Sequence, residues 1–176
     1  MMALASHALA QRHGLTPLAQ VAGYGRTQDS HHATAPHPEG IHASRAIMLA
    51  LNDARIGYDE VVYINPHGTG TPTNDPIETL AITRIFGKKS ATIPISSIKS
   101  MLGHMIGAAG AIESIICVMT IQNGTAHAAI NLDNIDEKCA SLDHILCKPR
   151  SIASGAVVKI SIGFGGSNVA LVFLPA

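Results

Sequence analysis

Two histidines and a lysine are the residues of this sequence best suited to chemistry. His67, Lys99 and His104 each lie in a turn rich in glycine or serine that follows a segment of β-strand composition. Imidazole N–H groups in such turns can donate hydrogen bonds to a carbonyl oxygen and stabilise the charge of an enolate or oxyanion. No convincing nucleophile accompanies them, so the sequence predicts half of an active site.

The strand and helix pattern predicts how these turns are positioned. Predicted strands cover 18–24, 61–64, 93–98, 156–162 and 168–173, and predicted helices cover 3–13, 41–55, 75–86 and a long stretch ending at 121. Their alternation predicts an α/β fold with a layered, mostly parallel or mixed sheet and flanking helices, and the length suits a single domain, 1–176. Ligands bind such sheets beyond the carboxyl ends of the strands, where the turn with His67 and the turn with Lys99 and His104 should both open.

Composition and charge exclude several classes of function. Twelve basic and twelve acidic residues cancel, which leaves no electrostatic footprint for nucleic acid or an anionic membrane. The longest apolar run, 105–121, contains Glu113 and is expected to be too short for a bilayer. Three cysteines without a CxxC pair and a start without a basic n-region favour the cytoplasm. The histidines of 31–42 lack a ligand motif, so no metal is expected.

Four segments carry a family resemblance. Residues 67–71 (HGTGT) resemble the signature block of β-ketoacyl-acyl-carrier-protein synthases, the condensing enzymes of fatty acid and polyketide synthesis. Further matches are 96–110 (SSIKSMLGHMIGAAG), 163–168 (GFGGSN) and 32–36 (HATAP). Their order and spacing imply the C-terminal half of a synthase of the elongating type, with a thiolase-like fold. The chain departs from the family at 160–162, where ISI replaces the common NSF, and at Pro66, which replaces alanine.

The resemblance implies roles for four residues around the donor substrate. His67 and His104 would hydrogen-bond the malonyl thioester carbonyl, assist decarboxylation and stabilise the resulting enolate. Lys99 would support the site electrostatically, with Glu113, 14 residues later, as its partner. A buried ammonium group needs such a counter-charge. No metal or redox cofactor is expected for this reaction.

The resemblance also implies an acyl carrier protein as partner. Thr69 and Thr71 would hold its phosphopantetheine arm, and their alternation along an extended segment places both hydroxyls on one side. Thr34 would lie near the pocket entrance and Phe164 in a gating turn beside the acyl pocket. From the residues alone, the glycines of 163–166 need only permit a tight turn. Residues 75–78 (DPIE) indicate helix-start chemistry, with Glu78 reaching back to the cap.

The expected nucleophile of the family is missing from this sequence. In the family a cysteine at a strand-to-helix turn accepts the acyl chain, whereas Cys117 lies within an apolar helix and Cys139 and Cys147 lie in a loop-rich region. The resemblance places that cysteine in an N-terminal half that is absent here. The chain alone is therefore expected to be inactive in condensation and to need that half, or a homodimer.

Three functions remain open on the sequence. The first is the C-terminal part of a β-ketoacyl-acyl-carrier-protein synthase, an acyltransferase of fatty acid biosynthesis. The second is a non-catalytic split or truncated subunit that pairs with a complete synthase. The third is a stand-alone malonyl-thioester decarboxylase, which ranks lowest because its pocket would lack a wall.

Overall fold

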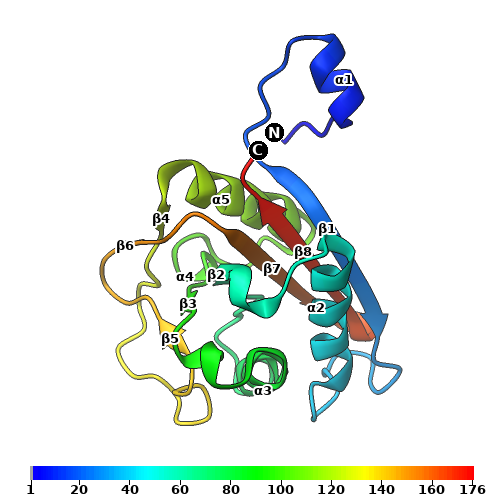
Figure 1. Ribbon diagram of the computed structural model, residues 1–176. Helices are drawn as coiled ribbons and strands as arrows, with labels where there is room; N and C mark the ends of the chain where they lie inside the picture. The colour runs from blue at the N-terminus through cyan, green and yellow to red at the C-terminus, as the bar shows by residue number, and fades with distance from the viewer. Residues whose placement is uncertain (1) are drawn as a thin grey trace.

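A mixed sheet of six strands organises the chain, with helices on both of its faces (Figure 1). The computed structural model describes residues 2–176. In spatial order the strands are β1 (Gln20–Gln28), β8 (Ser167–Leu174), β7 (Ala156–Gly163), β2 (Val61–Asn65), β3 (Pro94–Ile95) and β5 (Asp143–His144). A two-stranded sheet joins β4 (Thr125–Ala126) to β6 (Arg150–Ser151). The helices are α1 (His7–Arg12), α2 (Ile41–Ala54), α3 (Asn74–Phe86), α4 (Lys99–Leu102) and α5 (Ala109–Asn123), and 3-10 turns cover Tyr58–Glu60, Gly87–Ala91, Ile106–Ala108 and Phe164–Gly166.

Strand direction agrees with the predicted class. Strand β2 runs parallel to both β7 and β3, and β3 runs parallel to β5, while β8 is antiparallel to β7 and to β1. Right-handed crossovers through helices are the usual way to join parallel neighbours, and the antiparallel pair closes through the short turn 163–166. The α/β class with a mixed sheet and flanking helices is confirmed.

Alternation along β7 builds two separate cores on the sheet. Val158 and Ile160 pack in one apolar cluster with residues of α2 and α3, such as Ile47 and Ile82. Val157 packs in the other cluster with Cys117 of α5. Burying each such aliphatic side chain contributes about 1.5–3 kcal/mol. Figure 1 shows α2 and α3 on one side of the sheet and α5 on the other.

The predicted long helix ending at 121 is interrupted. A short α4 ends at Gly103, which has a φ of +73°, and a 3-10 turn precedes α5. Glycine at C′ ends a helix through a conformation that other residues avoid. The predicted helix extended past this break, although Gly103 and His104 precede the apolar run that begins at Met105. His104 therefore lies in the connection between α4 and the following 3-10 turn rather than inside a helix.

Other bounds differ by a few residues, and one expectation about membranes changes. The first strand extends to Gln28, the first helix begins at His7, and the strand expected over 93–98 is only Pro94–Ile95. The sequence predicted that the apolar run 105–121 is too short to cross a membrane. Ile106–Asn123 is in fact long and apolar enough to do so by length and composition alone. In this fold α5 instead packs against the sheet through buried Glu113 and Cys117.

Candidate active site

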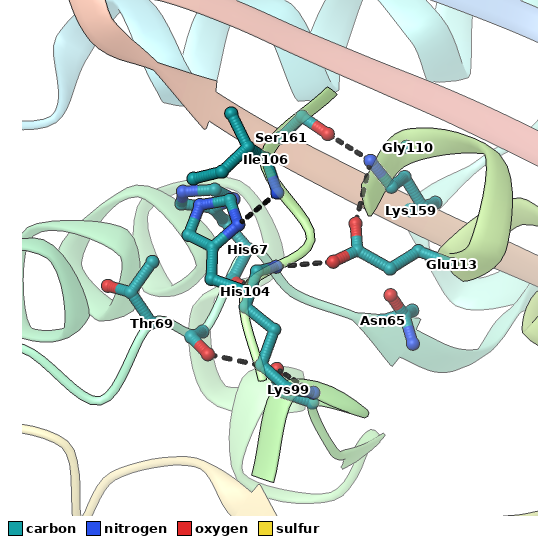
Figure 2. A network of polar contacts seen from close by, with 12 residues as sticks. Asn65, His67, Thr69, Lys99, His104, Ile106, Gly110, Glu113, Lys159 and Ser161 are labelled. Atoms are coloured by element: carbon teal, nitrogen blue, oxygen red, sulfur yellow. Dashed lines mark hydrogen bonds and ion pairs between the residues drawn. The ribbon is translucent and has the colours of Figure 1, made fainter. Parts of the chain in front are cut away.

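Two turns at the carboxyl edge of the sheet bring the predicted histidines together. His67 follows the end of β2 by two residues, and His104 follows α4, which begins shortly after β3. The centroids of the two rings are 5.3 Å apart, and the rings meet edge to face at 80°. Figure 2 shows them above Lys99 and beside Thr69. The parallel pairing of β2 with β3 therefore places both imidazoles at one point, as the strand order predicted.

Glu78 holds the turn that carries His67. Its Oε1 accepts the N–H of His67 at 2.7 Å and its Oε2 accepts the N–H of Gly68 at 2.9 Å. The prediction that Glu78 caps its own helix is wrong, because the first turn of α3 has no side-chain cap and the carboxylate turns inward. Burial raises the pKa of Glu78 to about 7, against the opposing effect of the two backbone N–H groups.

Close packing explains the glycine that follows His67. Gly68 has a φ of +47°, and a Cβ atom there would lie 2.6 Å from Cβ of Ser97. Ser97 Oγ donates to the carbonyl of Gly68 at 2.9 Å. The β2 turn is thus tied to the segment after β3, which fixes His67 relative to Lys99 and His104.

A cluster of buried charged side chains lies beside the histidines and bonds to the backbone of His67. Lys99 Nζ donates to the carbonyl of His67 and to Oε1 of Glu113. The side chains of Lys99 and Glu113 are only 6% and 3% exposed. Lys159, on β7, places its Nζ 3.0 Å from Oε2 of Glu113 and donates to Ser161 Oγ. The structure therefore brings Glu113 to Lys99 as predicted, and it adds a second lysine (Figure 2).

Burial and positive neighbours keep the His67 imidazole neutral. Burial is the largest cause that lowers its pKa from 6.5 to about 3, and the charges of Lys99, His104 and Lys159 act in the same direction. A neutral imidazole carries one N–H, so it can donate to an oxygen without bringing a full charge. This state suits stabilisation of an enolate oxygen.

His104 is oriented by the backbone that follows it. The N–H of Ile106 donates to Nδ1 of His104 at 3.1 Å. Because Nδ1 accepts, a neutral His104 carries its proton on Nε2. Ile106 has a φ of +49°, a strained conformation for a β-branched residue. In this conformation the N–H of Ile106 points at Nδ1 of His104, which leaves Nε2 free to donate.

Thr69 and Thr71 lie on one side of their segment, as their alternation predicts. Their hydroxyl oxygens are 2.9 Å apart, and Thr69 Oγ1 lies 3.5 Å from Oδ1 of Asp75. A cavity of about 520 Å³ opens beside both threonines and His104. Hydroxyl groups at the mouth of a cavity are suited to hydrogen-bond an extended ligand.

Thr34 and Phe164 lie in a second pair of loops at this edge of the sheet. The N–H of Gly165 donates to the carbonyl of Ala33 at 2.6 Å, which ties the turn holding Phe164 to the loop holding Thr34. Phe164 is 82% exposed and Thr34 is also exposed. Among residues 2–176 no hydrogen bond joins either of them to His67 or His104. Their predicted places at an entrance and a gate stay predictions.

The three cysteines differ in burial, and none of them lies at a strand-to-helix turn within residues 2–176. Cys117 is fully buried in α5, and burial raises the pKa of its thiol well above the ordinary value. Burial is also the main cause that raises the pKa of Cys139. Cys147 is exposed in a loop. Within residues 2–176 no group of three His, Cys, Asp or Glu side chains could hold a metal ion.

Comparison with known proteins identifies the class. Residues 18–133 match the family described as "Beta-ketoacyl synthase, C-terminal domain". The 3-oxoacyl-[acyl-carrier-protein] synthase 2 of Coxiella burnetii is 42% identical over 93% of this chain and 39% of its own length. The chain therefore belongs to the β-ketoacyl synthase family, as its C-terminal domain, and its fold is thiolase-like.

Solved structures agree with this assignment. A ketosynthase of a type II polyketide synthase, in complex with its acyl carrier protein and bound to a hexaketide, superposes with a TM-score of 0.93 at 35% identity, over 97% of this chain and 42% of that one. A ketosynthase of Xenorhabdus doucetiae, in complex with its chain length factor, gives a TM-score of 0.83 at 36% identity, over 92% and 40%. The chain thus spans about two fifths of the proteins it matches.

Sequence reasoning missed two residues that hold this site. Glu78 has a signal in the sequence, but helix-start chemistry explained it equally well. Lys159 has a clearer signal, because it is a lysine within the otherwise apolar segment 156–160. A charged residue in a strand buried on both faces requires a buried partner.

Proposed function

We propose that this chain handles the malonyl donor in the decarboxylative condensation catalysed by β-ketoacyl-acyl-carrier-protein synthases. The observation that carries the proposal is the edge-to-face pair of His67 and His104, 5.3 Å apart, over the buried Lys99–Glu113 ion pair. Two imidazoles this close can both donate a hydrogen bond to one enolate oxygen.

The chemistry follows from the state of these groups. The malonyl thioester carbonyl accepts one N–H from each imidazole. The bond between the α-carbon and the carboxylate breaks, carbon dioxide leaves, and the electron pair moves onto the carbonyl oxygen as an enolate. The enolate carbon then attacks the acyl thioester and expels its thiol. A neutral His67 serves this step because it can hold the oxyanion without protonating it fully.

The nucleophile and the carrier would come from outside this chain. We place the acyl-accepting cysteine in the part of a synthase that these residues do not cover, since burial makes Cys117 and Cys139 poor nucleophiles. Thr69 and Thr71 would bind the phosphopantetheine arm of an acyl carrier protein beside the cavity. The carrier complex of the polyketide ketosynthase supports such a partner. We propose fatty acid biosynthesis as the pathway, because the relatives are named as 3-oxoacyl-[acyl-carrier-protein] synthases. We propose the cytoplasm as the compartment.

Release of carbon dioxide tests this proposal. The chain would be mixed with malonyl-carrier protein and an acyl-carrier protein as acyl donor, with and without a cysteine-bearing N-terminal half of a synthase. We expect carbon dioxide and an elongated acyl chain only when that half is present. The double variant His67→Ala/His104→Ala should abolish both products, while His7→Ala, an exposed histidine on α1, should leave them unchanged. Release that survives the double variant contradicts the assigned roles.

One observation favours a second function, a non-catalytic subunit that pairs with a complete synthase. Solved relatives include a ketosynthase in complex with its chain length factor. The outer face of α5 offers half-buried Ile112 and Ile116 and exposed Met119 as apolar surface for such pairing. If this function holds, the double histidine variant should still form the complex, and the complex should retain full activity.

A further inference from the structure

Lys159 is a second buried lysine on a carboxylate that already has a partner. It lies in the middle of β7, and its side chain is 3% exposed. Because side chains alternate along a strand, Lys159 and Ser161 point to the face covered by α5, away from the cluster around Ile160. Its Nζ donates to Ser161 Oγ and lies 3.0 Å from Oε2 of Glu113.

The charges around Glu113 do not balance. Lys99 donates to Oε1 and Lys159 lies against Oε2, so one carboxylate faces two ammonium groups. Oε2 receives no directed hydrogen bond from residues 2–176, and Lys159 therefore acts on Glu113 as a charge. The formal sum of this cluster is +1. The N-terminal turn of α5, where the helix dipole is also positive, lies beside this cluster, since a Cβ atom at Gly110 would be 3.9 Å from Nζ of Lys159.

A contribution to folding stability does not explain why Lys159 lies here. The Lys99–Glu113 pair is complete without Lys159, and a further buried charge without its own counter-ion opposes folding. The positive charge also reaches the functional histidines, since Lys99 donates to the carbonyl of His67. A positive field at these rings favours neutral imidazoles and, in the same way, a negatively charged ligand beside them.

We propose that Lys159 makes the buried Lys99–Glu113 cluster cationic and thereby gives the His67–His104 site its affinity for an anion. Lys159 is a positioning residue, because it acts through Glu113 and Lys99 and is too buried to touch a ligand. That the anion is a malonyl group rests on the proposed function. The ionic attraction itself does not depend on it.

Binding of malonate to the 176-residue chain tests this inference without any turnover. The ring nitrogens of ¹⁵N-labelled histidines would be followed by NMR during titration with malonate and, in parallel, with its neutral analogue malonamide. His67→Gln and His104→Gln assign the signals. We expect malonate to shift both rings and Lys159→Met to weaken its binding at least tenfold, with malonamide binding unchanged. Lys148→Met removes an exposed lysine outside the site and should bind malonate like the wild type.

The melting temperature separates this role from a structural one. Lys159→Met leaves a neutral ion pair, so we expect the variant to melt at the same temperature or a few degrees higher while it loses the anion. Lys159→Arg keeps the charge and should restore part of the affinity. If Lys159→Met does not fold, Lys159→Gln, which keeps a polar contact to Ser161, carries the same comparison with Lys159→Arg.

Three results would overturn the inference. They are wild-type affinity for malonate in the folded neutral variants, equal binding of malonate and malonamide by the wild type, and no binding of malonate by the wild type. None of them decides the proposed function, which depends on carbon dioxide release in the presence of a cysteine-bearing half. Conversely, a chain that binds malonate through Lys159 but releases no carbon dioxide would retain this inference and lose the proposed function.

Discussion

The neutral state of His67 should make the stability of the chain depend on pH in a measurable way. In the unfolded chain this imidazole has its ordinary pKa of 6.5, and in the folded chain burial and the nearby positive charges lower the pKa to about 3. Between these values the unfolded chain binds more protons than the folded chain. The free energy of unfolding therefore falls as pH is lowered through this window.

The size of the effect follows from the two pKa values. At pH 5 the unfolded histidine is almost fully protonated and the folded one is neutral. This pH lies about 1.5 units below the unfolded pKa of 6.5. Each unit corresponds to about 1.36 kcal/mol, so His67 alone should remove about 2 kcal/mol of stability between pH 7.5 and pH 5. The variant His67→Gln cannot titrate and should not lose this amount.

Urea unfolding followed by far-ultraviolet circular dichroism at pH 7.5 and pH 5 measures this difference. Glu78, whose raised pKa of about 7 gives the opposite dependence above pH 4.5, is present in both proteins and cancels in the comparison. His7→Gln, at an exposed position, controls for loss of an ordinary histidine. If His67→Gln and the wild type lose the same free energy between the two pH values, His67 is not held neutral by its surroundings and the reasoning fails.

Three further predictions concern the same edge of the sheet. Glu78→Ala leaves two backbone N–H groups without their acceptor and should lower the free energy of unfolding at pH 7 by about 2 kcal/mol in urea titrations, whereas exposed Glu39→Ala should not. Gly68→Ala introduces a Cβ 2.6 Å from Ser97 at a positive φ and should reduce the melting temperature, while Gly107→Ala, with open space around it, should leave it within a degree or two. A thiol reagent at pH 8 should modify Cys147 rapidly and the other two cysteines only in denaturant, and fast modification of a second thiol in the folded chain would contradict the burial described.

The parts of the site that the sequence predicted depend on local patterns and strand order. The strand Val61–Asn65 is apolar and short, and the turn after it holds His67, so the placement at the carboxyl edge followed from the α/β class alone. The contact between Lys99 and Glu113 was available only through the family resemblance. Spacing along the chain cannot show it, because the break at Gly103 lies between them and turns the chain.

The residues that the sequence did not reveal act across distances that local patterns do not describe. Glu78 lies in a helix start and makes its bonds to a turn 11 residues earlier, so its type and position fitted two explanations. Lys159 depends on which face of β7 it occupies and on where α5 lies, and both are set by the packed sheet. Hydrophobic patterning locates a strand, but it does not say which buried charge on another element will meet it.

Burial of the β2 turn gives His67 and Glu78 opposite pKa shifts with one chemical consequence. Both shifts oppose charge, since burial lowers the pKa of an imidazole and raises that of a carboxyl group. Burial thus disfavours charge on His67 and Glu78, and the buried charge of the site lies on Lys99, Glu113 and Lys159. Under the proposed function, the enolate oxygen would meet the N–H of a neutral His67, with the net positive charge of Lys99, Glu113 and Lys159 behind it. That separation would stabilise such an intermediate while leaving no imidazolium proton on His67 to quench its carbon.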